Sequence, residues 1–218
     1  DAIAKLVEYC IRHFYPQAGG ADVALSAVGL LAKTVTAPAE LCASWMAAGF
    51  VHGVLNTDNM VVTGESFDYG PGRFLPYSDP SFTAAYFDER GLYAFGRQPA
   101  TGLWNLGQFA TCLTTVAGVE PLEKALATFE LAYRGAFRRR MLAVLGLDAL
   151  DEAADLRLLK ALFGWMGETR APWPQVFFDW FCGSASEMRA AASPIAGLYR
   201  APAFEPVRPA LMDHAPDR

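Results

Sequence analysis

One polar segment, residues 52–59, interrupts a sequence whose other long stretches are apolar at helical spacing. The chain has 218 residues and 53% of them are hydrophobic, so we expect a single domain with a buried core. Asn56, Thr57, Asp58 and Asn59 are typical of a turn, because their short side chains bond to nearby backbone groups. The chain must therefore fold as helices that flank one polar loop.

Apolar residues recur every three to four positions on both sides of this loop, which is the spacing of one helix face. The pattern predicts helices over residues 2–14, 21–50, 102–117, 120–140, 151–168 and 176–192, the second being one helix or two joined near Pro38. A β-hairpin is predicted from Met60 to Phe67, with its turn at Thr63–Glu65. The proline-rich tail beyond Pro194 is expected to wrap the surface in extended form. The predicted fold class is mainly α with a short β-hairpin.

The polar segment resembles the catalytic motif of protein kinases, H-R-D-x-x-x-x-N followed by D-F-G. His52 and Asn59 take the His and Asn positions, and Asp68-Tyr69-Gly70 takes the position of D-F-G. The catalytic Asp of that motif falls on Val54, which cannot accept a proton, and Asp58 is the carboxylate that could replace it. On spacing alone, the interpretation of these residues as a plain turn stays open.

The residues around this motif resemble the selenoprotein O family of protein adenylyltransferases, which are pseudokinases. The resemblance is densest from Trp45 to Ala110, and it runs through Gly49–Met60, Phe67–Pro71, Tyr93–Phe95, Gln98-Pro99 and Trp104–Leu106. It implies a two-lobed, kinase-like fold of which this chain is the C-terminal lobe. It also implies that ATP binds in a flipped orientation, so that AMP is transferred to protein hydroxyl groups.

The same resemblance implies the roles of three residues. Asp58 resembles the catalytic base, which would take or steer the proton of a Ser, Thr or Tyr hydroxyl of a protein substrate. Asn59 and Asp68 resemble the ligands of the Mg²⁺ or Mn²⁺ that accompanies ATP. Two oxygen ligands from the ends of a hairpin suit Mg²⁺, because this ion completes its shell with water and phosphate.

The chain is predicted to be one domain, residues 1–218, in four parts. Residues 1–50 are a helical lead-in, 51–70 the catalytic and metal-binding loop, 71–99 an activation-like segment, and 100–218 a helical remainder and tail. Neither a Gly-rich phosphate loop nor a strand Lys precedes the motif, so the N-terminal lobe is expected to be absent from this chain. We therefore expect residues 1–218 alone to bind ATP weakly and to be inactive.

The activation-like segment departs from the family pattern. Phe87–Arg90 and Leu92 stand where family members usually show a more polar, His-containing stretch. Arg73, Arg90 and Arg97 could meet phosphates, although a solvated charge or a structural ion pair is the commoner role of such loop arginines. Contacts to the protein substrate therefore cannot be carried over from the family in this segment.

Composition limits the partners and the cellular location that we expect for this protein. The net charge of -5 argues against a nucleic-acid partner, and no uninterrupted apolar run approaches the roughly 18 residues of a membrane span. The four scattered cysteines, without a C-x-x-C pair or a signal-peptide pattern, favour reduced thiols in the cytoplasm. The expected partners are ATP and protein substrates. An atypical kinase that transfers phosphate, against which Val54 counts, and a non-catalytic helical interaction module remain as alternatives.

Overall fold

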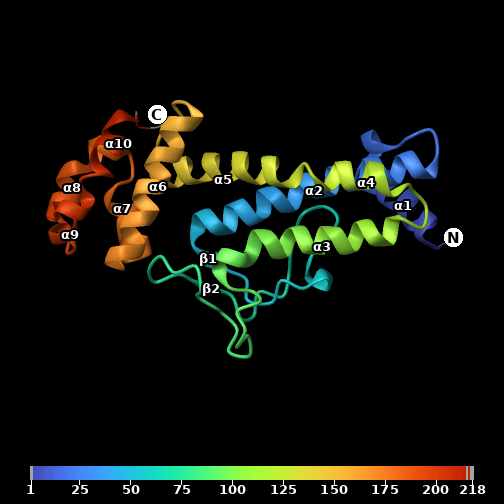
Figure 1. The fold of residues 1–218 in the computed structure, drawn as a ribbon, viewed down its shortest axis with the longest axis horizontal. Helices are drawn as coiled ribbons and strands as arrows, with labels where there is room; N and C mark the ends of the chain where they lie inside the picture. The colour runs from blue at the N-terminus through green and yellow to red at the C-terminus, as the bar shows by residue number, and fades with distance from the viewer. Residues whose placement is uncertain (1, 215, 217–218) are drawn as a thin grey trace.

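The computed structural model describes residues 2–214 and residue 216. Three long helices, α2 (Val23–Ala48), α3 (Gln98–Leu113) and α5 (Phe129–Leu145), lie side by side along the long axis of the molecule (Figure 1). The loops between α2 and α3 hang together from one side of this body. The prediction of a mainly helical chain is confirmed.

Helix α2 is the central element, because it packs against α3, α5, α1 (Ala2–His13) and α4 (Val119–Leu126). It begins where the Asp22 carboxylate accepts a hydrogen bond from the Leu25 N–H at 2.8 Å, and it ends at Gly49 with a left-handed φ of 66°. It runs without interruption through Pro38, so the alternative of two joined helices is wrong.

Helix α2 has 26 residues, and the mean hydropathy of its most apolar 18-residue window is 1.2, so by length and composition alone it could cross a membrane, although no uninterrupted apolar run of that length occurs in it. Half of its most apolar window is buried inside the fold. Length and hydropathy do not separate a membrane span from the central helix of a folded core. Its packing against four neighbouring helices is the arrangement of a core helix.

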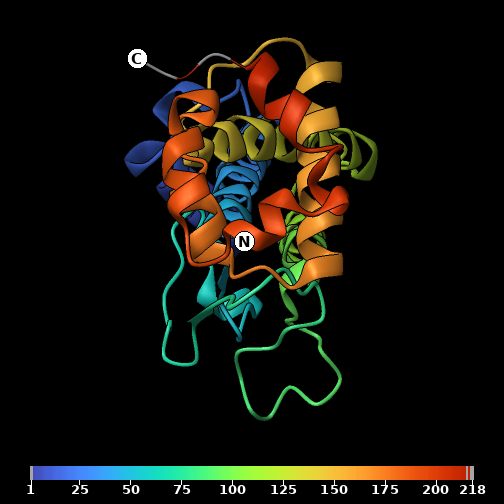
Figure 2. The same ribbon diagram turned by 90° about the vertical axis from the view of Figure 1, so that its left-hand side faces the viewer.

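Residues 152–213 form a second helical layer across the end of the long helices (Figure 2). It consists of α6 (Glu152–Thr169), α7 (Trp173–Asp179), α8 (Glu187–Ala192), α9 (Ala196–Arg200) and α10 (Arg208–Asp213). Short 3-10 helices add turns at Pro16–Ala18, Thr57–Asn59, Phe95–Arg97, Gly183–Ser186 and Pro202–Phe204. The tail is therefore helical, and the prediction of an extended tail is wrong.

Two predicted helices are each broken in the structure. The helix expected over residues 120–140 divides into α4 and α5 at Thr128, whose hydroxyl donates to the Ala125 carbonyl at 2.7 Å. The helix expected over residues 176–192 breaks at Cys182, which has a φ of 71° and donates its N–H to the Leu145 carbonyl at 2.7 Å. The first break thus carries a local side-chain hydrogen bond, and the second a backbone hydrogen bond to the end of α5.

The sheet does not lie where the hairpin was predicted. Strand β1 (Phe50–Val51) pairs antiparallel with β2 (Arg73–Phe74), so that Phe50 faces Phe74 and Val51 faces Arg73. Within Met60–Phe67 the chain does reverse, but only one isolated bridge, Met60 to Ser66, forms there. The short antiparallel sheet thus joins the two ends of the 52–72 loop, outside the Met60–Phe67 segment where the hairpin was predicted.

Candidate active site

His52 ties the start of the polar loop to its end. Its ring is fully buried, and Nδ1 accepts the N–H of Val54 at 3.3 Å. Nε2 lies 3.1 Å from the Phe67 carbonyl oxygen and 3.0 Å from the Ser66 hydroxyl oxygen. Because Nδ1 accepts, the proton lies on Nε2, and the ring donates to Phe67 in its neutral form. Burial lowers the pKa of His52, which agrees with a neutral ring, although the Phe67 carbonyl and Asp68 act in the opposite direction.

Asn59 lies in the 3-10 turn Thr57–Asn59 and is almost fully buried. Its Nδ2 donates to the Val54 carbonyl at 2.8 Å, and its own carbonyl accepts the Phe67 N–H at 3.3 Å and the Ser66 hydroxyl at 2.5 Å. Within the part of the chain that the structure describes, no hydrogen bond engages the side-chain Oδ1. This amide oxygen is therefore the group that Asn59 can offer to a hard cation.

Asp68 follows directly after the hydrogen bond between Phe67 and Asn59. The structure thus brings the backbones of the two predicted metal ligands to adjoining ends of one closed loop. Asp68 has a φ of 60°, a left-handed conformation that Asp tolerates better than most residues, and its side chain is exposed. That both side-chain oxygens point at one metal ion stays a prediction.

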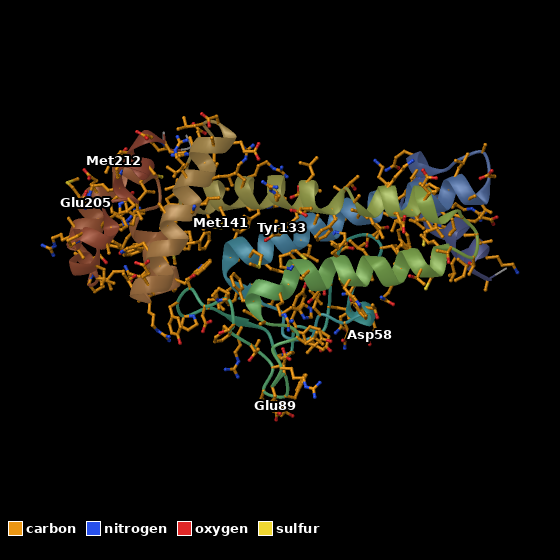
Figure 3. The ribbon with its side chains drawn as sticks, in the orientation of Figure 1. Asp58, Glu89, Tyr133, Met141, Glu205 and Met212 are labelled. Atoms are coloured by element: carbon orange, nitrogen blue, oxygen red, sulfur yellow. The ribbon has the colours of Figure 1, made fainter. Side chains whose placement is uncertain are left out.

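Asp58 is exposed in the same 3-10 turn as Asn59. Figure 3 shows it on the same side of the body as Glu89, which marks the tip of the activation-like segment. The Tyr93 hydroxyl from that segment donates to Asn56 Oδ1. Burial raises the pKa of Tyr93, and the negative charges of Asp88 and Asp58 raise it further, so Asp58 lies within electrostatic reach of this ring. The predicted base therefore faces solvent beside the activation-like segment.

A depression with a volume of about 580 Å³ lies beside Asp68. Its wall includes Val54 of the loop, Arg73 of β2, and Ala84 to Phe87 of the activation-like segment. Gly53 lets this segment lie close, because its φ is 86° and a Cβ there would be 3.0 Å from the Ala84 Cβ. A carboxylate and a guanidinium thus line one depression, an arrangement that can receive a metal ion together with a phosphate group.

Arg97 and Arg90 hold different positions. Arg97 donates to the Gly91 carbonyl at 3.2 Å, a contact within the activation-like segment itself. Arg90 is exposed in the loop and lines a separate hollow that it shares with Arg73. Of the three arginines, only Arg73 lies beside Asp68 in the same depression.

Two buried amides on α3 contact the loop, and the motif analysis did not single them out as site residues. Gln98 bonds to the backbone of Phe50 and His52, and Asn105 donates to the Leu55 carbonyl at 3.1 Å. The available signal was two amides seven residues apart on a largely apolar helix, which places them on one face.

A metal ion at this loop would rest on few protein ligands. Across residues 2–214 and 216, no group of three or more His, Cys, Asp or Glu side chains could hold a metal. One amide oxygen and one carboxylate fit Mg²⁺ or Mn²⁺ when phosphate and water supply the remaining positions. The residues present therefore fit a cation that arrives with a nucleotide.

A helical body that carries one closed polar loop, with an amide and a carboxylate at its ends, defines a candidate phosphate-transfer protein. The family model described as "Protein adenylyltransferase SelO" matches residues 1–197. The chain therefore belongs to the SelO family.

Curated relatives agree with this assignment. A protein of Gloeobacter violaceus named protein nucleotidyltransferase YdiU is 43% identical over 173 residues, which cover 78% of this chain and 35% of that protein. Proteins of the same name are 42% identical over 166 residues in Synechocystis (75% and 35% covered) and 37% identical over 203 residues in Myxococcus xanthus (93% and 41% covered). The chain thus spans 35% to 41% of the length of these relatives.

Proposed function

We propose that this chain supplies the catalytic and metal-binding loop of a protein adenylyltransferase. The whole protein would use ATP with Mg²⁺ or Mn²⁺ to transfer AMP to Ser, Thr or Tyr hydroxyl groups of other proteins. The observation that carries the proposal is the closure of the loop in a SelO-family chain. The His52 ring donates to the Phe67 carbonyl and the Phe67 N–H donates to the Asn59 carbonyl, and these two bonds hold Asn59 and Asp68 at adjoining positions. The four cysteines are free thiols, which supports a cytoplasmic location.

Each residue has a separate role in this proposal. Asn59 Oδ1 and the Asp68 carboxylate hold the cation, which neutralises charge on the triphosphate when it is bound. Arg73, in the same depression as Asp68, is placed to contact a phosphate oxygen. Asp58 accepts the proton of the attacking hydroxyl. The hydroxyl oxygen forms a bond to the α-phosphorus, the bond from that phosphorus to the bridging oxygen breaks, and pyrophosphate leaves.

The proposal concerns a complete protein as long as the YdiU relatives, of which this chain spans 35% to 41%. A kinase-like C-terminal lobe remains our interpretation of the helical body, and most of the adenine pocket would lie outside residues 1–218. We therefore expect these residues alone to bind ATP weakly. A micromolar affinity for ATP, measured on residues 1–218 by calorimetry, would show that the nucleotide pocket is more complete.

Transfer from ATP labelled at either the α- or the γ-phosphate tests the reaction. We expect the complete protein to label itself or an acceptor protein from the α-position only. Asp68→Ala should abolish labelling, and Asp58→Ala should lower turnover by roughly 10²–10⁴ while nucleotide binding is retained. Label from the γ-position would make the protein an atypical kinase, and no label from either position would support a non-catalytic helical module.

A further inference from the structure

The side chain of Gln98 occupies the edge of β1 that β2 leaves free. Its Oε1 accepts the His52 N–H at 2.9 Å, and its Nε2 donates to the Phe50 carbonyl at 2.9 Å. In a strand, residues i and i+2 direct their backbone groups to the same edge. Gln98, which is fully buried, therefore takes the place that a third strand would hold.

Asn105 holds the same loop two helical turns further along α3. Its Nδ2 donates to the Leu55 carbonyl at 3.1 Å and also lies 3.1 Å from the Met60 sulfur. The residue is almost fully buried. Helix α3 thus forms hydrogen bonds to the loop backbone at two places, before Gly53 and after Val54. These bonds fix the segment between them.

Close packing of α3 on α2 fixes where these two amides lie relative to the loop. Gly102 lies between them in the sequence, and a Cβ there would be 3.0 Å from the Cys42 sulfur. The Cys42 thiol lies 3.9 Å from the Gln98 carbonyl oxygen. Because a buried helix contact of this kind leaves little room for sliding, the amides have a defined position relative to the loop.

Short chains of hydrogen bonds connect the amides to the candidate metal ligands. The residue that Gln98 binds, His52, donates from its ring to Phe67, which directly precedes Asp68. The carbonyl of Val54, next to Leu55, accepts a hydrogen bond from Asn59 Nδ2.

We propose that Gln98 and Asn105 are positioning residues that set the orientation of Asp68 and Asn59 toward the metal-bound nucleotide. This inference rests on the function proposed above for those two ligands.

Apolar side chains could not replace these amides without consequence. Removal of the Gln98 amide would leave a buried N–H and a buried carbonyl without partners, and the backbone would have to move to satisfy them. A shift of β1 would move the His52 ring, and with it the Phe67 carbonyl that the ring holds next to Asp68. Outer-layer groups that orient metal ligands in this way typically change metal affinity or activity by about 10- to 100-fold.

The Gln98→Glu variant tests the proposal through its pH profile. At about pH 8.5 the introduced carboxylate cannot donate to Phe50, so AMP transfer by the complete protein should fall about 10- to 100-fold. Burial raises the pKa of a carboxyl group, so toward about pH 6 the neutral acid can both donate to Phe50 and accept from His52. The ratio of variant to wild-type activity should therefore rise as the pH falls. Gln108→Glu, an exposed amide on the same helix, should keep a flat ratio.

Asn105→Leu provides a second test that does not depend on a titrating group. We expect the MnCl₂ concentration for half-maximal transfer to increase about tenfold, with the thermal unfolding midpoint measured in parallel. Binding of MnCl₂ alone, followed by water-proton relaxation, supplies a readout that needs no transfer reaction. Gln108→Leu is the matched control, and circular dichroism checks that each variant is folded.

These outcomes separate this inference from the proposed function. A flat pH ratio for Gln98→Glu with unchanged Mn²⁺ affinity for Asn105→Leu overturns the positioning role, even if AMP transfer is real. Label from the γ-phosphate overturns adenylyl transfer, but recovery of that activity at low pH in Gln98→Glu supports positioning. If the wild-type protein transfers nothing, weaker Mn²⁺ binding in both variants supports the inference, and unchanged binding overturns it.

Discussion

His214 Nε2 lies 3.0 Å from Asp155 Oδ1, although 59 positions separate the two residues in the sequence and both are buried. The other ring nitrogen, Nδ1, lies 2.7 Å from the Ala210 carbonyl oxygen. Asp155 also accepts the Leu150 N–H at 3.1 Å and lies 3.5 Å from the Arg138 guanidinium. This buried cluster joins α10 and α5 to α6.

The first prediction concerns the stability that this cluster provides. Asp155→Ala should lower the free energy of unfolding by about 3–5 kcal/mol, because it leaves the buried His214 and the half-buried Arg138 without their common partner. Urea unfolding measures the change, and a cycle with His214→Ala gives the pairwise part. Asp148→Ala, at an exposed position, is the control and should stay within about 0.5 kcal/mol of the wild type. Equal losses for the two aspartates would refute the prediction.

The second prediction concerns alkaline pH. The Tyr199 hydroxyl donates to Asp179 Oδ2 at 2.7 Å, and burial, followed by this bond and the charge of Asp179, raises the pKa of Tyr199 far above its ordinary value of 10. An unfolded Tyr titrates near 10, so unfolding releases a proton above that pH, and stability falls as the pH rises. Tyr199→Phe should flatten this decline.

The measurement is the free energy of unfolding as a function of pH above about 10, the ordinary Tyr pKa. The slope should not vanish in Tyr199→Phe, because burial also raises the pKa of Tyr133. Tyr86→Phe is the control, since that ring is 95% exposed. If Tyr86→Phe and Tyr199→Phe flatten the curve equally, the Tyr199 environment is not its cause.

The third prediction separates the thiols. Cys112 is exposed, whereas Cys42 is buried and its pKa is raised by burial to about 12. Because the thiolate is the reacting form, a maleimide at neutral pH should modify Cys112 first and leave Cys42 untouched in the folded protein. Mass spectrometry of time points identifies the sites, and Cys112→Ser should remove the fast phase. Modification of Cys42 at the rate of Cys112 would show that the contact between α2 and α3 opens readily.

The fourth prediction compares two glycines. Gly53→Ala should destabilise the protein by about 1–3 kcal/mol, because a side chain there meets a left-handed φ and a close Ala84. Gly107 lies within helix α3, and no atom would lie within 4 Å of its Cβ. Gly107→Ala should therefore stabilise the protein by about 0.5–1 kcal/mol. Urea unfolding of both variants tests the opposite signs, and a shared sign would contradict the packing of residues 84–85 on the loop.

Periodicity in the sequence predicted the helices well where one apolar face persists. Helix α6 begins one residue after Asp151, whose carboxylate accepts the Ala154 N–H at 2.8 Å as an N-terminal cap should. The tail was missed because its prolines suggested an extended chain. Pro202 and Pro209 instead lie in the first turns of short helices, where a missing N–H costs little. Phe204, Val207 and Leu211 are thereby buried.

At the candidate site, too, the sequence predicted local features and missed long-range contacts. Motif spacing and the family resemblance made Asp58, Asn59 and Asp68 candidates, and their roles stay predictions. The structure explains how the last two reach adjoining positions. Gln98 could not be assigned a role from the sequence, because its partners Phe50 and His52 are more than 40 positions away. Nor does the sequence show that Arg138 is half-buried against Asp155, because this contact depends on how α5 meets α6.

The amide of Gln98 also determines how this small sheet can meet other chains. An exposed strand edge invites pairing with a further strand, from a bound peptide or from an aggregating copy. Since Gln98 already satisfies Phe50 and His52, β1 offers no such edge at these groups. Among the residues that the structure describes, the outer edge of β2 is the edge of this sheet that can accept an added strand. Its residues, Arg73 and Phe74, are exposed, so any strand that joins the sheet must align beside the arginine that lines the depression at Asp68.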